Sequence, residues 1–149
     1  DNLVVVSPDV GGVKNARAYS DAFGANLAIV AKHRVSATKV EAMNVIGDVK
    51  GKDAFLIDDM TETGGTLCAA AKILKANGAK RIFAGVSHAV IEENARKRIL
   101  ESDIESLITT NSVPMAYGEK VTALSVAPLF GEAIRRIHHG ESVTSLFDI

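Results

Sequence analysis

The chain has 149 residues, 47% of them hydrophobic, and its 17 basic and 18 acidic side chains leave a formal net charge of −1. This length suits one domain that buries a substantial core, about 70% of the unfolded surface by general scaling. The balanced charge argues against a nucleic-acid-binding stripe and against a basic patch for a membrane surface. Because the sequence has no apolar run that would span a bilayer and no charged-then-apolar leader, we expect a cytoplasmic protein.

The chain has a single cysteine, Cys68, which excludes an internal disulfide and fits a reducing compartment. It stands in an alanine-rich stretch that has a helical pattern. We therefore interpret Cys68 as a buried structural thiol and not as a nucleophile.

Strands and helices are predicted to alternate along the chain. In chain order, the patterns predict a strand over 3–6, a helix over 13–23, strands over 27–30 and 55–58, a helix over 65–76, a strand over 81–87, a helix over 92–100, strands over 106–110 and 121–126, and a helix over 129–138. The segment 35–51 is mixed and contains turn signals, which favour a short hairpin or excursion over a helix. The last helix carries Phe130, Ala133, Ile134 and Ile137 on one face.

This alternation is typical of an α/β fold in which a mostly parallel, twisted sheet carries helices on both faces as a three-layer sandwich. In such folds, ligands bind in the crevice beyond the carboxyl ends of the strands. The polar loops that follow the predicted strands are therefore the candidates for a functional site.

The most informative stretch is residues 54–66, in which an apolar run ends at two adjacent acids and Thr-Gly-Gly-Thr leads into a helix. Backbone N–H groups of such a turn converge at a helix N-terminus, where the helix dipole favours an anion. Glycines allow close approach and the hydroxyls of Thr63 and Thr66 can donate, so the pattern favours a bound phosphate. Asp58 and Asp59 can accept from ribose hydroxyls or hold magnesium indirectly. The alternative is an ordinary strand-to-helix turn with an acidic N-cap.

A second glycine turn, Ser-Pro-Asp-Val-Gly-Gly at residues 7–12, also stands between a predicted strand and a helix. It can accept an anion in the same way. Taken alone, however, a Pro-Asp-x-Gly sequence is more often only a turn.

Taken together, several motifs resemble the ribose-phosphate pyrophosphokinase family over nearly all of the chain. The loop at 54–66 resembles the ribose 5-phosphate loop of the type I phosphoribosyltransferase fold. The other segments that carry the resemblance are residues 7–12, 32–34, 109–111, 132–138 and 140–143. The resemblance covers only the C-terminal domain of that family, whose members have a preceding domain of similar fold that contributes much of the ATP site. We therefore expect residues 1–149 to be a single phosphoribosyltransferase-like domain.

The resemblance implies transfer of the pyrophosphoryl group of MgATP to the anomeric hydroxyl of ribose 5-phosphate, which gives 5-phosphoribosyl 1-pyrophosphate and AMP. It assigns ribose 5-phosphate binding to Asp58, Asp59, Thr61, Thr63, Gly64, Gly65 and Thr66. It makes residues 7–12 the pyrophosphate loop, with Asp9, Gly11 and Gly12, and makes Asp9 a ligand of Mg²⁺. It also implies a homo-oligomer in which neighbouring subunits complete the ATP site.

The resemblance places Lys32 and Arg34 as catalytic residues on a mobile loop that closes over ATP. Phosphoryl-type transfer depends mainly on positioning and on neutralising charge on the transferred group. Lys32 would supply a point charge and Arg34 a bidentate fork.

Some positions depart from the family pattern or are open. Glu62 stands where aspartate is commoner, and His88 matches a family histidine although residues 89–94 differ from the family sequence. His88 is equally compatible with a structural role at a strand end. We expect the polar residues 109–111 to line the sugar site, and we interpret His138 and His139 as cations at a helix C-terminus.

Two other functions share parts of this pattern. A phosphoribosyltransferase that consumes phosphoribosyl pyrophosphate has the same sugar-phosphate loop but needs a hood over its nucleobase, and the tail at 140–147 is more similar to the synthases. A regulatory or assembly relative without catalysis is also compatible, because in the family the preceding domain brings adenine contacts and a magnesium-binding histidine. We accordingly expect weak or absent synthase activity from the chain alone, with the sugar-phosphate site still formed.

Overall fold

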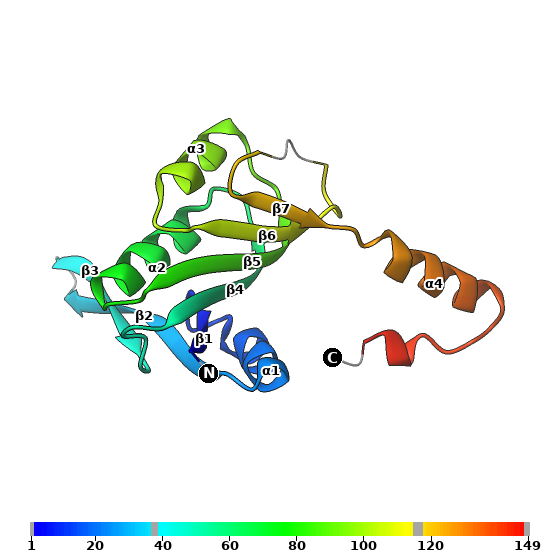
Figure 1. The fold of residues 1–149 in the computed structure, drawn as a ribbon, viewed down its shortest axis with the longest axis horizontal. Helices are drawn as coiled ribbons and strands as arrows, with labels where there is room; N and C mark the ends of the chain where they lie inside the picture. Colours follow the sequence, from blue (N-terminus) through cyan, green and yellow to red (C-terminus); the bar gives the residue numbers. More distant parts are fainter. Residues whose placement is uncertain (1, 37–38, 115–117, 148–149) are drawn as a thin grey trace.

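The computed structural model describes the backbone of residues 2–36, 39–114 and 118–147, and the side chains of the same residues except 32–36 and 39–42. In chain order its elements are β1 (Leu3–Ser7), α1 (Val13–Phe23), β2 (Asn26–Ser36), β3 (Lys39–Ile46), β4 (Asp53–Thr61), α2 (Gly65–Ala76), β5 (Arg81–Ala89), α3 (Glu93–Glu101), β6 (Ser106–Thr110), β7 (Val121–Leu124), α4 (Ala127–His138) and the 3-10 turn η1 (Thr144–Leu146). Figure 1 shows their arrangement.

The strands form one seven-stranded sheet in the order β3-β2-β1-β4-β5-β6-β7. All neighbouring pairs are parallel except β2 and β3, which are antiparallel. Parallel strands are buried on both faces, and β1 accordingly reads as a continuous apolar run in which Val4, Val5 and Val6 are fully buried.

Helices cover both faces of the sheet. Because successive side chains of a strand point to opposite faces, Val4 and Val6 join the larger core under α2 and α3, whereas Val5 packs with Ala16 of α1 and with Ile57. Leu67 and Leu74 of α2 and Ile99 of α3 are fully buried in the larger core. The α/β fold predicted from the sequence, with a mostly parallel sheet and helices on both faces, is thus confirmed.

β2 and β4 extend furthest beyond their predicted ranges, because neighbouring strands pair with the added residues. β2 continues to Ser36 by pairing with β3, in the register Lys32↔Met43 and Arg34↔Glu41. The expectation of a loop at residues 32–34 is therefore wrong for the backbone. The segment 35–51, predicted as a short hairpin or excursion and not a helix, holds only the second strand of a hairpin, β3, whose first strand is β2. β4 continues through Asp58 and Asp59 to Thr61, because β5 pairs with it as far as Thr61↔Ala89.

The helix α4 lies apart from the layered part of the fold, beyond β7 (Figure 1). None of its residues is buried. Hydrogen bonds fix the point where it leaves the sheet: Asn111 Oδ1 accepts from Val126 N at 2.9 Å, and Asn111 N donates to Leu124 O at 3.0 Å. Within the described ranges, no helix is both long and apolar enough to cross a membrane.

Candidate functional site

The sheet has a topological switch point between β1 and β4. From β1 the chain crosses to β2 on one side, and β4 lies on the other side. In open α/β sheets this is where ligands bind, beyond the carboxyl ends of the strands. The loop after β1 and the end of β4 are the two sequence-predicted motifs, so the topology brings both to this point.

Two adjoining clefts occupy the switch point. The first has a volume of about 330 Å³ and is lined by Asp58, Met60, Thr61, Glu62, Thr63, Gly65 and Thr66. The second has a volume of about 220 Å³ and is lined by Asp9, Gly11, Gly12, Asn15, Asp58 and Asp59. Asp58 lines both clefts, so the two clefts meet at this residue.

The turn between β4 and α2 depends on a left-handed residue. Gly64, the N-cap of α2, has φ 67° and ψ 0°, which L side chains rarely adopt. A Cβ there would also lie 3.1 Å from Cγ1 of Ile99 in α3. Gly64 lines neither cleft, so its role is to turn the chain so that Thr63, Gly65 and Thr66 surround the helix N-terminus. Gly65 N donates to Thr63 Oγ1 at 3.3 Å.

The loop after β1 folds around the carboxylate of Asp9. Gly12 N donates to Asp9 Oδ1 at 2.9 Å, and Ser7 Oγ donates to the Asp9 carbonyl at 2.6 Å. A Cβ on Gly12 would lie 2.9 Å from Ser7 Oγ, so a side chain at this position would displace the hydroxyl that bonds to the Asp9 carbonyl. Asp9 is exposed at the mouth of the second cleft.

Carboxylates concentrate negative charge in this space. Burial raises the pKa of Asp58 above its usual range, and the nearby carboxyls of Asp59 and Asp9 add to the rise. The Asp58 Oδ1 atom accepts a hydrogen bond from Asp59 N at 3.0 Å, and this bond opposes part of the rise in the pKa of Asp58. A cation or a row of hydroxyl donors would relieve this repulsion.

A metal would need additional ligands from its substrate. Among the described residues, His, Cys, Asp and Glu side chains form no group of three or more that is placed to hold a metal ion. Magnesium commonly uses one or two carboxylates together with substrate phosphates and water. The carboxylates of Asp9, Asp58 and Asp59, which share the second cleft, match that donor chemistry.

The two predicted catalytic cations lie on β2. The backbone of Lys32 and Arg34 continues the strand next to β1, in the part of β2 that pairs with β3. Their side chains lie outside the described residues.

Arg98 is a site residue that the sequence reasoning missed. Its Nη1 atom donates to the carbonyl oxygen of Thr63 at 2.7 Å, which ties the turn after β4 to α3. Together with Glu62 and Glu92, it lines a further cleft of about 410 Å³ on the α3 side of this turn. No spacing in the sequence connects Arg98 with Thr63, because the contact depends on the tertiary packing of α3, whose buried residues are Ala95 and Ile99.

The polar residues at the ends of β5 and β6 mostly bond to one another. His88 Nδ1 lies 2.7 Å from Ser112 Oγ, and Thr110 Oγ1 donates to the Ser87 carbonyl at 2.7 Å. The side chain of Asn111 fixes the start of α4, as described above. Thr109 and Thr110 border a groove beside α1 that is also lined by Asp58, the residue shared by the two clefts.

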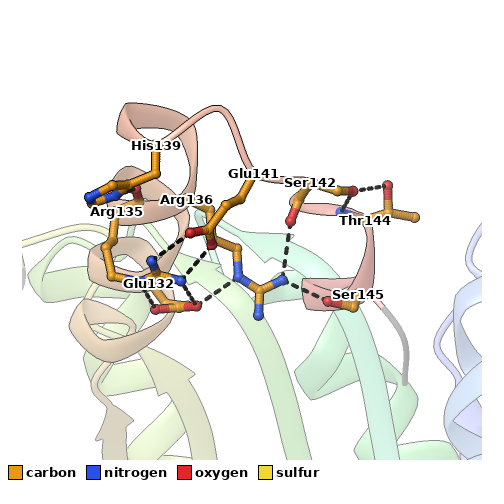
Figure 2. A network of polar contacts seen from close by, with 8 residues as sticks. All are labelled: Glu132, Arg135, Arg136, His139, Glu141, Ser142, Thr144 and Ser145. Atoms are coloured by element: carbon orange, nitrogen blue, oxygen red, sulfur yellow. Dashed lines mark hydrogen bonds and ion pairs between the residues drawn. The ribbon is translucent and has the colours of Figure 1, made fainter.

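Cys68 and His139 each contact a backbone carbonyl oxygen. Cys68 Sγ donates to Arg98 O at 3.8 Å, and burial raises the pKa of the thiol, which disfavours the nucleophilic thiolate. His139 Nδ1 lies 2.7 Å from the Arg135 carbonyl at the end of α4 (Figure 2).

Comparison with known proteins gives the family. The family model described as the phosphoribosyl synthetase-associated domain matches residues 33–148. The chain belongs to this family. A ribose-phosphate pyrophosphokinase from Helicobacter pylori is 51% identical to this synthetase-associated domain over 147 residues, which cover 98% of the chain and 46% of the relative. A ribose-phosphate pyrophosphokinase from Vibrio parahaemolyticus is 50% identical over 153 residues, which cover 99% of the chain and 49% of that relative. The chain thus spans about half the length of the curated relatives it matches.

Solved structures agree with the family and the fold. The crystal structure of phosphoribosylpyrophosphate synthetase from Mycobacterium smegmatis matches the domain with a TM-score of 0.87 and 36% identity, over 94% of this chain and 46% of that one. Orotate phosphoribosyltransferase from Aeropyrum pernix matches with a TM-score of 0.55 and 17% identity, over 88% of this chain and 66% of that one. This second likeness concerns the fold alone.

Proposed function

We propose that the chain is a ribose 5-phosphate-binding domain of a ribose-phosphate diphosphokinase, the enzyme class that transfers pyrophosphate from MgATP to ribose 5-phosphate. One observation carries the proposal: the predicted sugar-phosphate loop and the predicted pyrophosphate loop line two clefts that share Asp58 at the switch point of the sheet. The curated relatives that are about 50% identical to the chain are named ribose-phosphate pyrophosphokinase, which is this activity.

The first cleft suits a phosphorylated pentose. The phosphate would lie at the N-terminus of α2, where Thr63, Gly65 and Thr66 surround the cleft and the helix dipole favours an anion. The carboxylates of Asp58 and Asp59 would accept hydrogen bonds from the vicinal ribose hydroxyls. Thr61, which lines the same cleft, would contribute a further hydroxyl.

The second cleft suits the group that is transferred. Gly11 and Gly12 allow phosphate oxygens to approach the backbone at the start of α1. Mg²⁺, held by Asp9 together with substrate phosphates and water, would supply positive charge against the phosphate oxygens when it is bound. Lys32 and Arg34 would add charge that offsets the negative oxygens of the transferred group.

In the proposed reaction, the anomeric oxygen of ribose 5-phosphate forms a bond to the β-phosphorus of ATP. The bond between the β-phosphorus and the oxygen that bridges to the α-phosphorus breaks, AMP leaves with that oxygen, and the anomeric hydroxyl loses its proton. Holding both substrates in line can supply up to about 7–11 kcal/mol of the barrier reduction in favourable cases. The role of this domain is therefore mainly to position the sugar phosphate.

A calorimetric titration tests the proposal. Ribose 5-phosphate is titrated with magnesium into the purified chain and into the Asp58→Ala, Asp59→Ala double variant, with ribose as the ligand that lacks the phosphate. We expect saturable binding of ribose 5-phosphate, loss of binding in the double variant, and much weaker binding of ribose. Absence of binding to the folded wild-type chain would contradict the proposal.

A further inference from the structure

Lys120 has a backbone conformation that its residue type disfavours. Its φ is 64°, and among the described residues it is the one non-glycine residue with a positive φ. Val121 N donates to Gly118 O at 3.1 Å, so Lys120 is the third residue of a tight turn that leads into β7. With a positive φ, this position of a turn usually has glycine. A lysine that keeps this strained conformation directs attention to the contacts of its side chain.

The side chain of Lys120 binds the end of α3. Its Nζ atom donates to the carbonyl oxygens of Leu100 at 2.8 Å and of Ser102 at 3.1 Å. Carbonyl groups in the last turn of a helix have no partner within the helix, and the helix dipole is negative at this end, so an ammonium group is favoured there. Figure 1 shows α3 beside the edge of the sheet that β6 and β7 form, where this contact lies.

The backbone of Lys120 is fixed to the sheet. Leu107 N donates to Lys120 O at 2.6 Å, and Leu107 is fully buried in β6. The lysine therefore connects the sheet with the C-terminal end of α3. Within Glu93–Glu101 only Ala95 and Ile99 are buried, so core packing alone holds this helix at few points.

Other contacts of α3 lead to the sugar-phosphate turn at residues 63–66. Arg98 Nη1 donates to Thr63 O at 2.7 Å, and the carbonyl oxygen of Arg98 accepts from Cys68 Sγ at 3.8 Å. Burial raises the pKa of the Cys68 thiol, and the charges of Arg98 and Lys120 both oppose this rise, so the two cations lie near the same side chain. One short helix thus links the lysine to the turn.

We propose that Lys120 is a positioning residue for the sugar-phosphate turn: by holding the C-terminal end of α3, it keeps Arg98 in place to hold the Thr63 carbonyl. The effect on ribose 5-phosphate rests on the proposed function, whereas the link itself belongs to the free chain. Thr63, Gly65 and Thr66 line the cleft proposed for the phosphate. Loss of the lysine contact therefore moves the donors of that cleft while every residue of the turn stays the same.

Three substitutions of Lys120 separate positioning from stability. Lys120→Met removes the ammonium group and should weaken ribose 5-phosphate binding about threefold, a size typical of remote coupling. Lys120→Arg keeps a cationic donor and should bind nearly as the wild type does. Lys120→Gly removes the side chain and the left-handed strain together, so it should be more stable than Lys120→Met in urea and yet bind no better. Binding that follows stability through all three variants would contradict the positioning role.

The double variant Lys120→Met, Arg98→Met tests the connection through α3. Because Lys120 acts through Arg98, the double variant should bind ribose 5-phosphate no more weakly than Arg98→Met alone. Arg81→Met is the matched control, since it removes a charged donor that pairs with Asp53 at the amino end of the strands, and it should bind as the wild type does. Additive losses from the two single substitutions would overturn the proposal.

Amide NMR of the free chain keeps this test separate from that of the proposed function. The N–H resonances of Gly65 and Thr66 report on the turn. They should shift in Lys120→Met and in Arg98→Met, and they should stay unchanged in Arg81→Met. Unshifted resonances in Lys120→Met would show that the proposal is wrong, whatever the chain binds. If the resonances shift but the wild-type chain does not bind ribose 5-phosphate, the link between Lys120 and the turn stands and the proposed function fails.

Discussion

The ionised carboxylate of Asp58 has opposite effects on ligand binding and on the stability of the fold. Its carboxyl lines both clefts, and burial together with Asp59 and Asp9 raises its pKa. An ionised Asp58 therefore destabilises the folded chain when the site holds no ligand. A sugar with two hydroxyl donors, or a magnesium ion, would favour the ionised form, so the ligand stabilises the same charge that the free protein disfavours.

We predict that Asp58→Asn stabilises the free chain near neutral pH and weakens ribose 5-phosphate binding. Between the ordinary aspartate pKa of 3.8 and the raised value, the folded state binds more protons than the unfolded chain, so the stability of the wild type falls as pH rises through this window. Asp58→Asn has no ionisable group at this position and therefore does not lose stability in this pH window. Its binding should be weaker by about 1.5 kcal/mol, roughly tenfold in Kd, because a charged hydrogen-bond acceptor is replaced by a neutral one.

Thermal unfolding at several pH values and calorimetric titration measure both effects. The stability gain of Asp58→Asn should shrink as the pH falls toward 3.8, where the wild-type carboxyl also becomes neutral. A gain that is the same at every pH would contradict the assignment of the effect to the charge of Asp58.

Arg98 acts on the site through the backbone of Thr63. We predict that Arg98→Met weakens ribose 5-phosphate binding roughly fivefold, about 1 kcal/mol, because the turn after β4 loses a charged hydrogen-bond donor. Lys97→Met is the matched control, since Lys97 precedes it on α3 and its side chain is 73% exposed in a pair with Glu101. Titration of both variants measures the difference, and equal effects would show that Arg98 has no specific role.

At the scale of elements, the β4–α2 turn is held by its packing on α3. Gly64 combines a left-handed backbone with close approach to Ile99, and Arg98 holds the preceding carbonyl. The position of the sugar-phosphate loop therefore depends on a helix that is distant in the sequence. Displacement of α3 would move the loop even if the residues of the loop were unchanged.

We predict that Gly64→Ala lowers the free energy of unfolding by about 2–4 kcal/mol, from left-handed strain plus overpacking against Ile99. Gly24→Ala separates the two terms, because Gly24 has a similar φ of 60° at the end of α1 and a Cβ there would meet nothing within 4 Å. That control should cost only about 1–2 kcal/mol. Urea unfolding of both variants measures the difference, and equal costs would mean that the contact with α3 contributes nothing.

Local patterns predicted most elements and the main loops of the candidate site. The helices over 13–23 and 65–76 agree with α1 and α2 at both ends, because apolar periodicity and glycine stops are local signals. The extension of β2 through residues 32–34 was missed because it depends on pairing with β3. The contact between Arg98 and Thr63 was missed for a similar reason, since it arises from the packing of separate elements.

At the scale of the whole molecule, the layers of the described fold hold a buried core, whereas α4 has no buried residue. The apolar face of α4 was predicted from its spacing, but its exposure was not, because periodicity identifies an apolar face without identifying what covers it. The synthetase-associated domain also spans only about half the length of its curated relatives.

The size and lining of the two clefts lead to a prediction about turnover. The two clefts at the switch point have volumes of about 330 and 220 Å³ and are lined mainly by polar groups and glycines. Sites for drug-sized ligands usually occupy about 300–1,000 Å³ with largely apolar walls, so these clefts suit a sugar phosphate better than ATP with its adenine ring. We therefore expect the chain to bind ribose 5-phosphate and to form little or no AMP from ATP. Chromatographic assay of AMP, with ribose 5-phosphate and magnesium present, measures this, and AMP formation that depends on ribose 5-phosphate and is lost in Asp58→Ala would prove the expectation wrong.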